Sequence, residues 1–154
     1  MHIQWLVKKF EELSPYQLYA ILQLRNEVFV VEQNCVFQDA DDKDQNSWHL
    51  MGFENNKLVA YTRLVPPGEI HKESSIGRVV TSPSARGKKI GKELMERSID
   101  TTYNLFGKSP IKIGAQVYLK KFYESLGFQQ ISNVYMEDGI EHIYMMLDDG
   151  GLKS

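Results

Sequence analysis

A basic, glycine-containing turn is the part of the sequence best suited to bind a ligand. The run from Arg86 to Lys92 reads Arg-Gly-Lys-Lys-Ile-Gly-Lys and lies between a β-branched segment, Ile76 to Thr81, and an amphipathic helical pattern. The backbone N–H groups of Gly87 to Gly91 open this helix, so they have no acceptor within it. A helix start is partly positive and suits a phosphate group, and the flanking basic side chains add positive charge. We therefore expect an anion-binding turn here.

Two other phosphate motifs do not fit this turn. A P-loop needs Gly-x-x-x-x-Gly-Lys followed by Ser or Thr. Here the spacing from Gly87 to Gly91 is one residue short, and Glu93 stands where the magnesium-binding hydroxyl should be. The dinucleotide fingerprint Gly-x-Gly-x-x-Gly is also absent from the sequence. The turn is therefore a phosphate site of another kind, or a basic, solvated helix start that binds no ligand.

The composition is that of an ordinary globular chain. The 154 residues are expected to form one domain, 1–154, with a single sizeable core. The hydrophobic content is 42%, the charged content is 25% and the formal net charge is −2, which gives no support for a nucleic-acid or membrane partner. One cysteine, Cys35, excludes an internal disulfide and fits a reducing compartment. We expect a cytoplasmic protein without a metal site.

Hydrophobic patterns and turn residues place the other elements. Strands are predicted at Ile3–Val7, Trp48–Glu54, Lys57–Val65 and Ile111–Ala115, and in a final hairpin of Phe128–Met136 and Ile140–Leu147. Helices are predicted from Ser14-Pro15 to near Val30, from the basic turn to about Asn104, and at Val117–Leu126. The pairs Asn55-Asn56 and Asp138-Gly139 are typical of tight hairpin turns.

The order of these elements gives an α+β fold. A helix connects the strand Ile76–Thr81 to the strand Ile111–Ala115, so these two should be parallel in a mostly antiparallel sheet. The basic turn then lies at the carboxyl end of a strand, where open sheets bind ligands. The acidic segment Asp39–Asp44 lacks the pattern of a calcium loop, so we expect a solvated loop with a short helical turn. Gly150 to Ser154 is expected to fray.

The turn and a later segment together resemble one known family. Arg86-Gly87-Lys88-Lys89-Ile90-Gly91 resembles the pyrophosphate loop of the GNAT acetyltransferases, Arg/Gln-x-x-Gly-x-Gly/Ala, except that Lys89 stands where the first glycine is usual. Val117 to Phe128 is similar to the second GNAT signature, a helix followed by Tyr-x-x-x-Gly-Phe. The segments Leu24–Cys35, Gly114–Gln116 and Tyr135–Ile143 are similar to the ElaA-like branch. The resemblance covers most of the chain and implies the GNAT (acyl-CoA N-acyltransferase) fold, a mixed, mostly antiparallel sheet with a splayed parallel strand pair and flanking helices.

The same resemblance implies direct transfer of an acetyl group from acetyl-CoA to an amine of a small molecule or peptide. The residues expected to contact coenzyme A are Val79, Val80, Thr81, Arg86, Gly87, Lys88, Lys89, Ile90, Gly91, Lys92, Gln116 and Tyr123. The Val80 N–H would stabilise the oxyanion of the tetrahedral intermediate, and Tyr123 would protonate the leaving thiolate. GNAT proteins often dimerise, which makes a homodimer possible.

The acceptor amine must attack as a free base, so a further group must remove its proton. By residue type the candidates are Glu32, Asp44, His49 and His142. We expect Glu32 to act as the base, because it follows the first helix, which borders the acceptor cleft in this family. The structural alternatives are a solvated surface glutamate for Glu32 and a core aromatic for Tyr123.

Two other functions fit the same residues. A non-catalytic acyl-CoA-binding module would leave Tyr123 without a chemical role. An acyltransferase that takes its acyl group from an acyl-carrier protein would use a basic docking patch, and the cluster of Arg86, Lys88, Lys89 and Lys92 fits that need. A preference for acyl-carrier protein over acyl-CoA in a binding assay would favour the second alternative.

Overall fold

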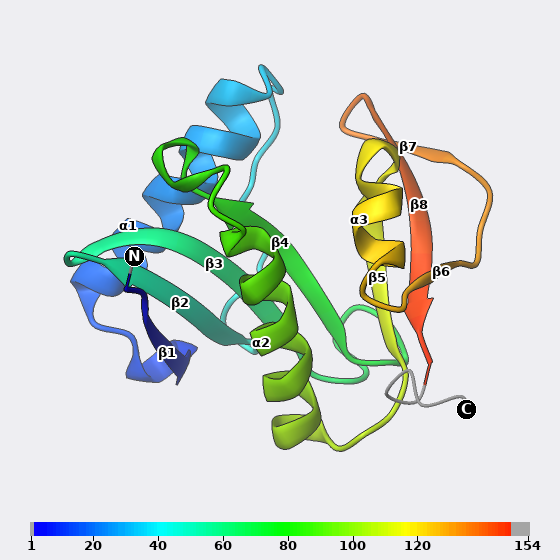
Figure 1. Ribbon diagram of the computed structural model, residues 1–154, viewed down its shortest axis with the longest axis horizontal. Coiled ribbons are helices and arrows are strands. Elements are labelled where there is room, and N and C mark those ends of the chain that lie inside the picture. Colours follow the sequence, from blue (N-terminus) through cyan, green and yellow to red (C-terminus); the bar gives the residue numbers. More distant parts are fainter. Residues whose placement is uncertain (1, 149–154) are drawn as a thin grey trace.

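The first sheet is antiparallel, with its strands in the order β1-β2-β3-β4 (Figure 1). The computed structural model describes residues 2–148, and the tail expected at Gly150–Ser154 lies outside them. The strands are β1 (Gln4–Lys9), β2 (Trp48–Glu54), β3 (Lys57–Val65) and β4 (Ser75–Thr81). β2 and β3 have the predicted bounds, and Asn55 and Asn56 take positive φ angles of 50° and 65° in the turn between them. The predicted hairpin is confirmed.

The second sheet is built around β8 (Ile140–Leu147). This strand pairs antiparallel with β5 (Ile111–Gln116), β6 (Gln129–Gln130) and β7 (Tyr135–Glu137). The turn predicted at Asp138-Gly139 is confirmed, with φ angles of 52° and 77°. The continuous strand predicted at Phe128–Met136 is wrong, because it is split into β6 and β7. Ser132 lies in the break, where its hydroxyl accepts the Tyr144 N–H at 2.8 Å in place of a strand carbonyl.

The two sheets meet at the start of β4 and β5. Ser74 and Ile111 form a parallel bridge, and the Lys112 N–H donates to the Ser74 carbonyl at 3.0 Å. From there the two strands diverge toward their carboxyl ends, as Figure 1 shows. The parallel orientation and the α+β class with a splayed strand pair are thus confirmed. The opening between the diverging strands positions the site described below.

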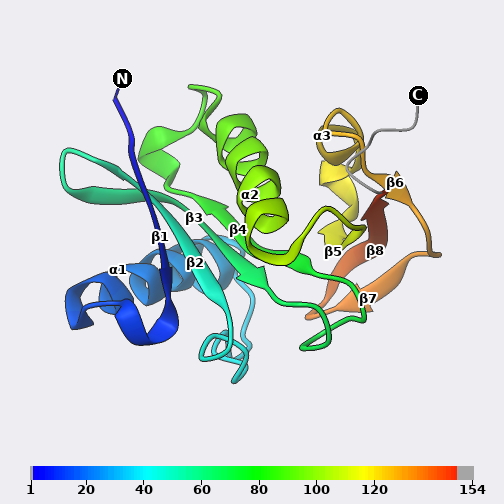
Figure 2. The same ribbon diagram turned by 90° about the horizontal axis from the view of Figure 1, so that it is seen from below.

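Helices cover both faces of the first sheet. α1 (Pro15–Arg25) lies against one face and α2 (Ile90–Phe106) against the other (Figure 2). α1 buries Ile21 against Tyr61, and α2 buries Leu94 in a larger core that continues into the second sheet. Each such apolar side chain stabilises the fold by about 1.5–3 kcal/mol. Short helical segments also form at η1 (Phe10–Glu12), η3 (Pro83–Ala85), η4 (Val117–Leu119) and α3 (Lys120–Glu124). The last two occupy the range of the helix predicted at Val117–Leu126, which is therefore shorter than expected.

The first helix changes its winding before it ends. Its start is as predicted, because Ser14 Oγ accepts the Gln17 N–H at 3.1 Å as an N-cap. The helical run ends at Glu32, close to the predicted end near Val30, but the change in winding within it was not predicted. The α-helix stops at Arg25, and Asn26–Glu32 (η2) winds as a π-helix, whose N–H groups reach carbonyls five residues earlier. Three residues of this segment are valines, whose branched side chains slightly lower the propensity for an α-helix.

The acidic segment Asp39–Asp44 is not the solvated loop that we expected. Its carboxylates bind three arginines, and we call the set Arg25, Asp39, Asp41, Asp44, Arg63 and Arg78 the arginine–aspartate cluster. Asp39 and Asp44 are 7% and 8% exposed, and Arg25 is fully buried. Arg25 donates from Nε to Asp39 at 2.7 Å and from Nη1 to Asp44 at 2.8 Å. Asp39 and Asp44 are buried with their charges paired, as buried charges require, whereas Ala40 and Asp42 of the same segment are exposed.

Candidate active site

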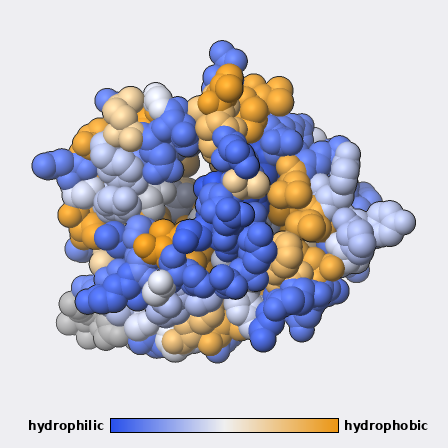
Figure 3. Space-filling view, turned by 180° about the vertical axis from the view of Figure 1, so that it is seen from behind, coloured by the Kyte–Doolittle hydropathy of each residue, from blue (hydrophilic) through white to orange (hydrophobic). Residues whose placement is uncertain are grey.

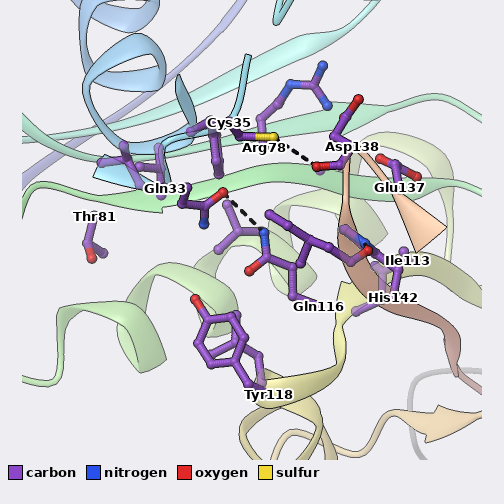
Figure 4. A pocket seen from close by; sticks show the side chains of 18 of the residues that line it. Gln33, Cys35, Arg78, Thr81, Ile113, Gln116, Tyr118, Glu137, Asp138 and His142 are labelled. Carbon is purple, nitrogen blue, oxygen red and sulfur yellow. Dashed lines mark hydrogen bonds between the residues drawn. The ribbon is translucent and has the colours of Figure 1, made fainter. Parts of the chain in front are cut away.

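A cleft of about 700 Å³ lies between the diverging ends of β4 and β5. Its walls come from η2, β4, β5, α3 and the β7–β8 turn (Figure 4). A groove of about 390 Å³ continues from the cleft along the basic turn and the start of α2, and the two share Thr81, Arg86, Gly91 and Phe122. Seen from behind, the molecule is hollowed between its two halves, with hydrophilic and hydrophobic side chains around the opening (Figure 3). Segments far apart in sequence therefore meet at one hollow.

Most residues predicted to bind a cofactor line these two hollows. The cleft is lined by Val79, Val80, Thr81, Arg86, Gly91, Gln116 and Tyr123, and the groove adds Gly87, Lys89, Ile90 and Lys92. Lys88 is exposed beside them and lines neither hollow. Of the candidate bases, Glu32 and His142 line the cleft, and Asp44 and His49 do not. His49 is buried and bonds the Tyr61 hydroxyl at 2.6 Å and the Asp44 carbonyl at 3.0 Å, which fits a structural role.

The basic turn presents its backbone to solvent just before α2. Gly87 has a φ of 84°, and Lys89 has a φ of 61° and a ψ of 20°, so both lie in the left-handed region. Glycine enters this region freely, whereas a lysine does so at a cost of roughly 1–2 kcal/mol. Lys89 thus takes a conformation that favours glycine. The side chains from Arg86 to Lys89 are exposed, and the N–H groups that open α2 are placed to meet an anion.

Arg86 and Glu32 join the basic turn to η2 across the mouth of the cleft. Arg86 Nη1 and Nη2 bond the two Glu32 carboxylate oxygens at 2.6 and 2.7 Å. This bidentate pair lowers the pKa of Glu32 and raises the pKa of Arg86. Arg86, predicted to bind a phosphate, and Glu32, predicted to act as the base, are therefore paired with each other. A carboxylate held in this way is a weaker proton acceptor than a free one.

A bulge in β4 interrupts its pairing with β3 beside the cleft. Val80 stands opposite Tyr61, but Arg78 and Val79 together stand opposite Thr62. Arg78 has a φ of 50°, the left-handed conformation that such a bulge needs. Its side chain is held by the arginine–aspartate cluster. The cluster therefore fixes the strand where it lines the cleft.

The direction of the N–H groups along β4 follows from its ladder. The Ser82 N–H donates to the Val59 carbonyl of β3 at 2.7 Å. Antiparallel neighbours alternate between bonded and non-bonded pairs, so the Val80 N–H also points toward β3. The N–H groups of Val79 and Thr81 then point away from β3, to the side of the cleft. These two residues form the free edge of the strand.

Tyr123 of α3 lies in the wall of the cleft and is 5% exposed. Its ring packs edge-on against Phe122 and Phe128, with ring centroids 5.2 and 5.9 Å away. Burial raises the pKa of the Tyr123 hydroxyl, so the group stays protonated at neutral pH. The residue is thus part of the core, as the structural alternative expects, and it also has access to the cleft. These two descriptions are compatible.

The other mouth of the cleft joins η2 to the β7–β8 turn. Cys35 Sγ donates to the Asp138 carbonyl at 2.9 Å, and Gln116 Nε2 lies 3.5 Å from Gln33 Oε1 (Figure 4). Sequence reasoning assigned no role in the site to Gln33 or to Asp138. It missed them because the π-helix and the hairpin bring them together from opposite ends of the chain. His142 of β8 lies at the same mouth.

Residues 2–148 show neither a candidate membrane span nor a candidate metal site. Within residues 2–148, no helix has both the length and the apolar character needed to cross a membrane. The same range holds no group of three or more His, Cys, Asp and Glu side chains placed to bind a metal ion.

Comparison with known proteins agrees with this geometry. The sequence model of the acetyltransferase (GNAT) domain matches residues 16–148. Protein ElaA of Escherichia coli strain K12 is 44% identical over 145 residues, which are 93% of this chain and 95% of that protein. The crystal structure of E. coli ElaA matches with a TM-score of 0.89 at 42% identity, covering 96% of this chain and 100% of that one. The crystal structure of an acyl-CoA N-acyltransferase from Pseudomonas aeruginosa matches with a TM-score of 0.90 at 41% identity, covering 94% and 99%. The chain therefore belongs to the GNAT acetyltransferase family, with ElaA among its relatives, and is an acyltransferase.

Proposed function

We propose that the protein moves an acetyl group from acetyl-CoA directly to an amine of a small molecule or peptide. The observation that carries this proposal is one continuous path, from the basic turn, along the free edge of β4, to the Tyr123 hydroxyl. Acetyl-CoA has phosphates at one end, an extended arm with amide groups, and a thioester at the other end. Along the path, cations come first, then unpaired backbone N–H groups of β4, then a proton donor, which is the order of the parts of acetyl-CoA that they would contact.

The phosphates would rest on the basic turn. The N–H groups from Gly87 to Gly91 supply donors, and Lys89 and Lys92 line the groove as cations. Arg86 is engaged by Glu32 at 2.6 Å, so it would contact a phosphate by exchanging one anion for another. Lys88 would contribute through its charge alone, because it lines neither hollow.

The arm would lie between β4 and β5 as an added strand. The outward N–H groups of Val79 and Thr81 are suited to amide carbonyls on the arm, in the manner of a peptide that joins a sheet edge. Gln116 lines the opposite wall and supplies a side-chain amide. The splay is what makes room, because paired strands are about 4.8 Å apart and leave no space for a third chain.

We assign the oxyanion donor to the Val79 N–H rather than to the Val80 N–H of the sequence prediction. Alternation along the ladder directs the Val80 N–H to β3 and the Val79 N–H away from β3, to the side of the cleft. A fixed backbone donor at a developing oxyanion is worth about 10²–10³ in rate. Val80 still lines the cleft.

Tyr123 would then protonate the thiolate as the tetrahedral intermediate collapses. Its raised pKa keeps the proton on the hydroxyl until a strongly basic thiolate forms nearby. The aromatic packing that buries the ring also limits its rotation. A rigid acid at the end of the path is the feature that separates an enzyme from a module that merely binds acyl-CoA.

Calorimetry with acetyl-CoA tests the cofactor site, with Gly87→Glu as the variant and Gly68→Glu as its control. Both glycines have a left-handed φ, 84° and 91°, and an added Cβ would meet nothing within 4 Å at either, so the two substitutions are matched in backbone strain. Gly68 lines neither hollow. We expect wild type and Gly68→Glu to bind alike, and Gly87→Glu to lose at least tenfold in affinity, because it puts an anion beside the phosphates.

Binding by wild type that Gly87→Glu leaves unchanged would put the cofactor elsewhere, and no binding of any short acyl-CoA would refute the proposal. The acceptor is then sought with a thiol-release assay over a panel of amines. Release that depends on the amine supports transfer. Binding without release toward any amine would favour the acyl-CoA-binding module. Binding of acylated acyl-carrier protein in preference to acetyl-CoA would favour the other alternative donor.

A further inference from the structure

His142 in β8 uses only one of its two ring nitrogens in a hydrogen bond among residues 2–148. The residue is 9% exposed and lines the cleft wall. Its Nδ1 lies 2.8 Å from the Ile140 carbonyl oxygen. A carbonyl accepts hydrogen bonds and does not donate them, so this contact assigns the hydrogen to Nδ1 and leaves the lone pair of the neutral ring on Nε2. Among residues 2–148, no group is hydrogen-bonded to Nε2. The ring therefore offers an unoccupied base.

The ring is held in place by Tyr135, the first of a row of aromatic side chains. Tyr135 stacks on His142 with centroids 5.7 Å apart, and Tyr144 stacks on Tyr135 at 4.6 Å. His71 closes the row with an edge contact to Tyr144 at 5.5 Å. Gly114 makes room for the row, since a Cβ there would lie 2.8 Å from the Tyr135 hydroxyl. The orientation of Nε2 is therefore set by packing as well as by the Ile140 carbonyl.

His142 and Tyr123 approach the cleft from opposite faces of the second sheet. Ala115 and Ile143 are opposite each other in β5 and β8, and both pack in the core with Tyr123. Side chains alternate along a strand, so the next pair, Gln116 and His142, points to the other face. Both Tyr123 and His142 line the cleft, which therefore connects the two faces. With the cofactor entering beside α2 and α3, the mouth at His142 is left for the acceptor.

The charges at this mouth favour an ammonium ion. Glu137 and Asp138 are exposed on the β7–β8 turn and line the cleft beside His142 (Figure 4). Arg78 lines the same mouth, but its guanidinium is paired with Asp39 at 2.8 Å and with Asp41 at 3.4 Å. The unpaired charge near His142 is thus negative, which concentrates cations. An amine arrives in this protonated form at neutral pH.

We infer that His142 Nε2 is the base that takes the proton from the acceptor ammonium group, and this inference rests on the proposed function. The ammonium N–H bond breaks, its proton moves to Nε2, and its electron pair stays on nitrogen. That pair forms the C–N bond to the thioester carbonyl, and the C–S bond then breaks. The thiolate takes the Tyr123 proton, Tyr123 regains one from the new amide nitrogen, and His142 releases its proton to solvent. The products are the acetylated amine and free thiol.

Glu32, the base expected from the sequence, is less suited to this step. Its carboxylate oxygens are both bonded to Arg86, and this pair lowers the pKa of Glu32. Proton removal by Glu32 first requires that bidentate pair to open. His142 Nε2 needs no such change, because no described group occupies it.

The test compares His142→Ala and His142→Gln with His71→Ala. His71 is a matched control, because it ends the same aromatic row and lines neither hollow. Each variant is checked for acetyl-CoA affinity by calorimetry and for folding by urea denaturation. Transfer is measured by thiol release with the best acceptor among ethylamine, tyramine, spermidine and alanyl-lysine. Imidazole is added to restore a base, and pyrazole serves as a ring of the same size that is a far weaker base.

Loss of the base is expected to lower kcat by about 10²–10⁴ in both His142 variants, with unchanged acetyl-CoA affinity. Imidazole should restore part of the rate of His142→Ala, and pyrazole should not. His71→Ala should keep the wild-type kcat. A rate loss shared by His71→Ala, or rescue by both rings, would show a packing role and overturn the inference, as would a wild-type rate in His142→Gln. If wild type itself acetylates no amine, the proposed function fails and this inference with it.

Discussion

The arginine–aspartate cluster allows a sharp prediction at Asp44. This carboxylate is 8% exposed and accepts from Arg25 Nη1 at 2.8 Å and Arg63 Nη1 at 3.0 Å. Asp44→Asn keeps the shape of the side chain but removes the charge that both buried guanidinium groups share. Removing one partner of a buried pair costs about 3–5 kcal/mol. Each arginine keeps a second carboxylate, Arg25 with Asp39 and Arg63 with Asp41, so we expect the lower end, about 3 kcal/mol.

Urea denaturation measures this loss through the midpoint at an unchanged m value. About 3 kcal/mol corresponds to a drop in melting temperature of roughly 6–12 °C for a chain of this size. Asp42→Asn is the matched control, because Asp42 lies in the same loop, is exposed, and has a φ of 63° that asparagine also tolerates. We expect it to change stability by less than about 0.5 kcal/mol. A loss at Asp44 below about 1 kcal/mol, or one equal to that of Asp42→Asn, would refute the energetic role of the cluster.

The same cluster predicts how acid acts on stability. Burial alone would raise the pKa of Asp41, but hydrogen bonds and charge from Arg63 outweigh it and lower the pKa to about 2. Burial is likewise outweighed at Asp44, whose pKa is lowered by Arg25 and Arg63. Carboxylates with a depressed folded-state pKa stabilise the fold above their ordinary value of 3.8, and this stabilisation is lost as the pH falls toward about 2. In Asp44→Asn, stability should therefore fall less steeply between pH 4 and 2.

Three further substitutions test other parts of the structure. Tyr123→Phe should lower kcat by at least about 10²-fold, because it removes the proton donor. The acetyl-CoA affinity and the urea midpoint should not change, because the packed ring remains. A wild-type rate in the thiol-release assay would remove Tyr123 from the mechanism. Gly114→Ala would place a Cβ 2.8 Å from the Tyr135 hydroxyl, so we expect urea denaturation to show a free energy of unfolding lower by about 1–3 kcal/mol. Gly77→Ala is the control and should cost less, because the nearest contact of its Cβ is at 4.0 Å. Equal losses in the two variants would contradict the close approach at Gly114. Lys89→Gly should leave the free energy of unfolding unchanged or raise it by up to about 1 kcal/mol. The substitution relieves the strain of a left-handed lysine in the folded state, and this gain offsets or exceeds the greater entropy of glycine in the unfolded chain. A clear loss of stability would mean that the lysine side chain holds the turn.

Local signals predicted the parts of the fold that are set by neighbours in sequence. Alternating apolar residues and the pair Asn55-Asn56 placed β2 and β3 with their observed bounds. The basic turn and Tyr123 were found because short motifs carry them. The burial of Asp44 was missed, since its partners Arg25 and Arg63 lie 19 residues away on either side and no local pattern signals the pairing. An acidic run is predicted to be solvated when the basic residues that pair with it are distant in sequence.

The sequence likewise did not show which group of the site has which chemical role. Which N–H of β4 faces the cleft depends on a one-residue bulge, and composition does not show where a bulge falls. The π-helix after Arg25 also has no simple pattern, and it sets where Glu32 lies. Glu32 and His142 were both candidates by residue type, and the sequence favoured Glu32. The carboxylate's bond to Arg86 and the free nitrogen of the imidazole distinguish them in three dimensions.

The unpaired edges of β4 and β5 have a thermodynamic consequence. The two sheets are joined by backbone at Ser74 and Ile111, and a molecule that bonds both edges farther along would bind the folded chain and not the unfolded one. At a concentration of 100 times its Kd, such a ligand adds about 2.7 kcal/mol to the free energy of unfolding. That corresponds to a rise in melting temperature of roughly 5–11 °C. Melting curves recorded with a series of acyl-CoA thioesters would thus rank donors by the stability they confer, before any acceptor is known.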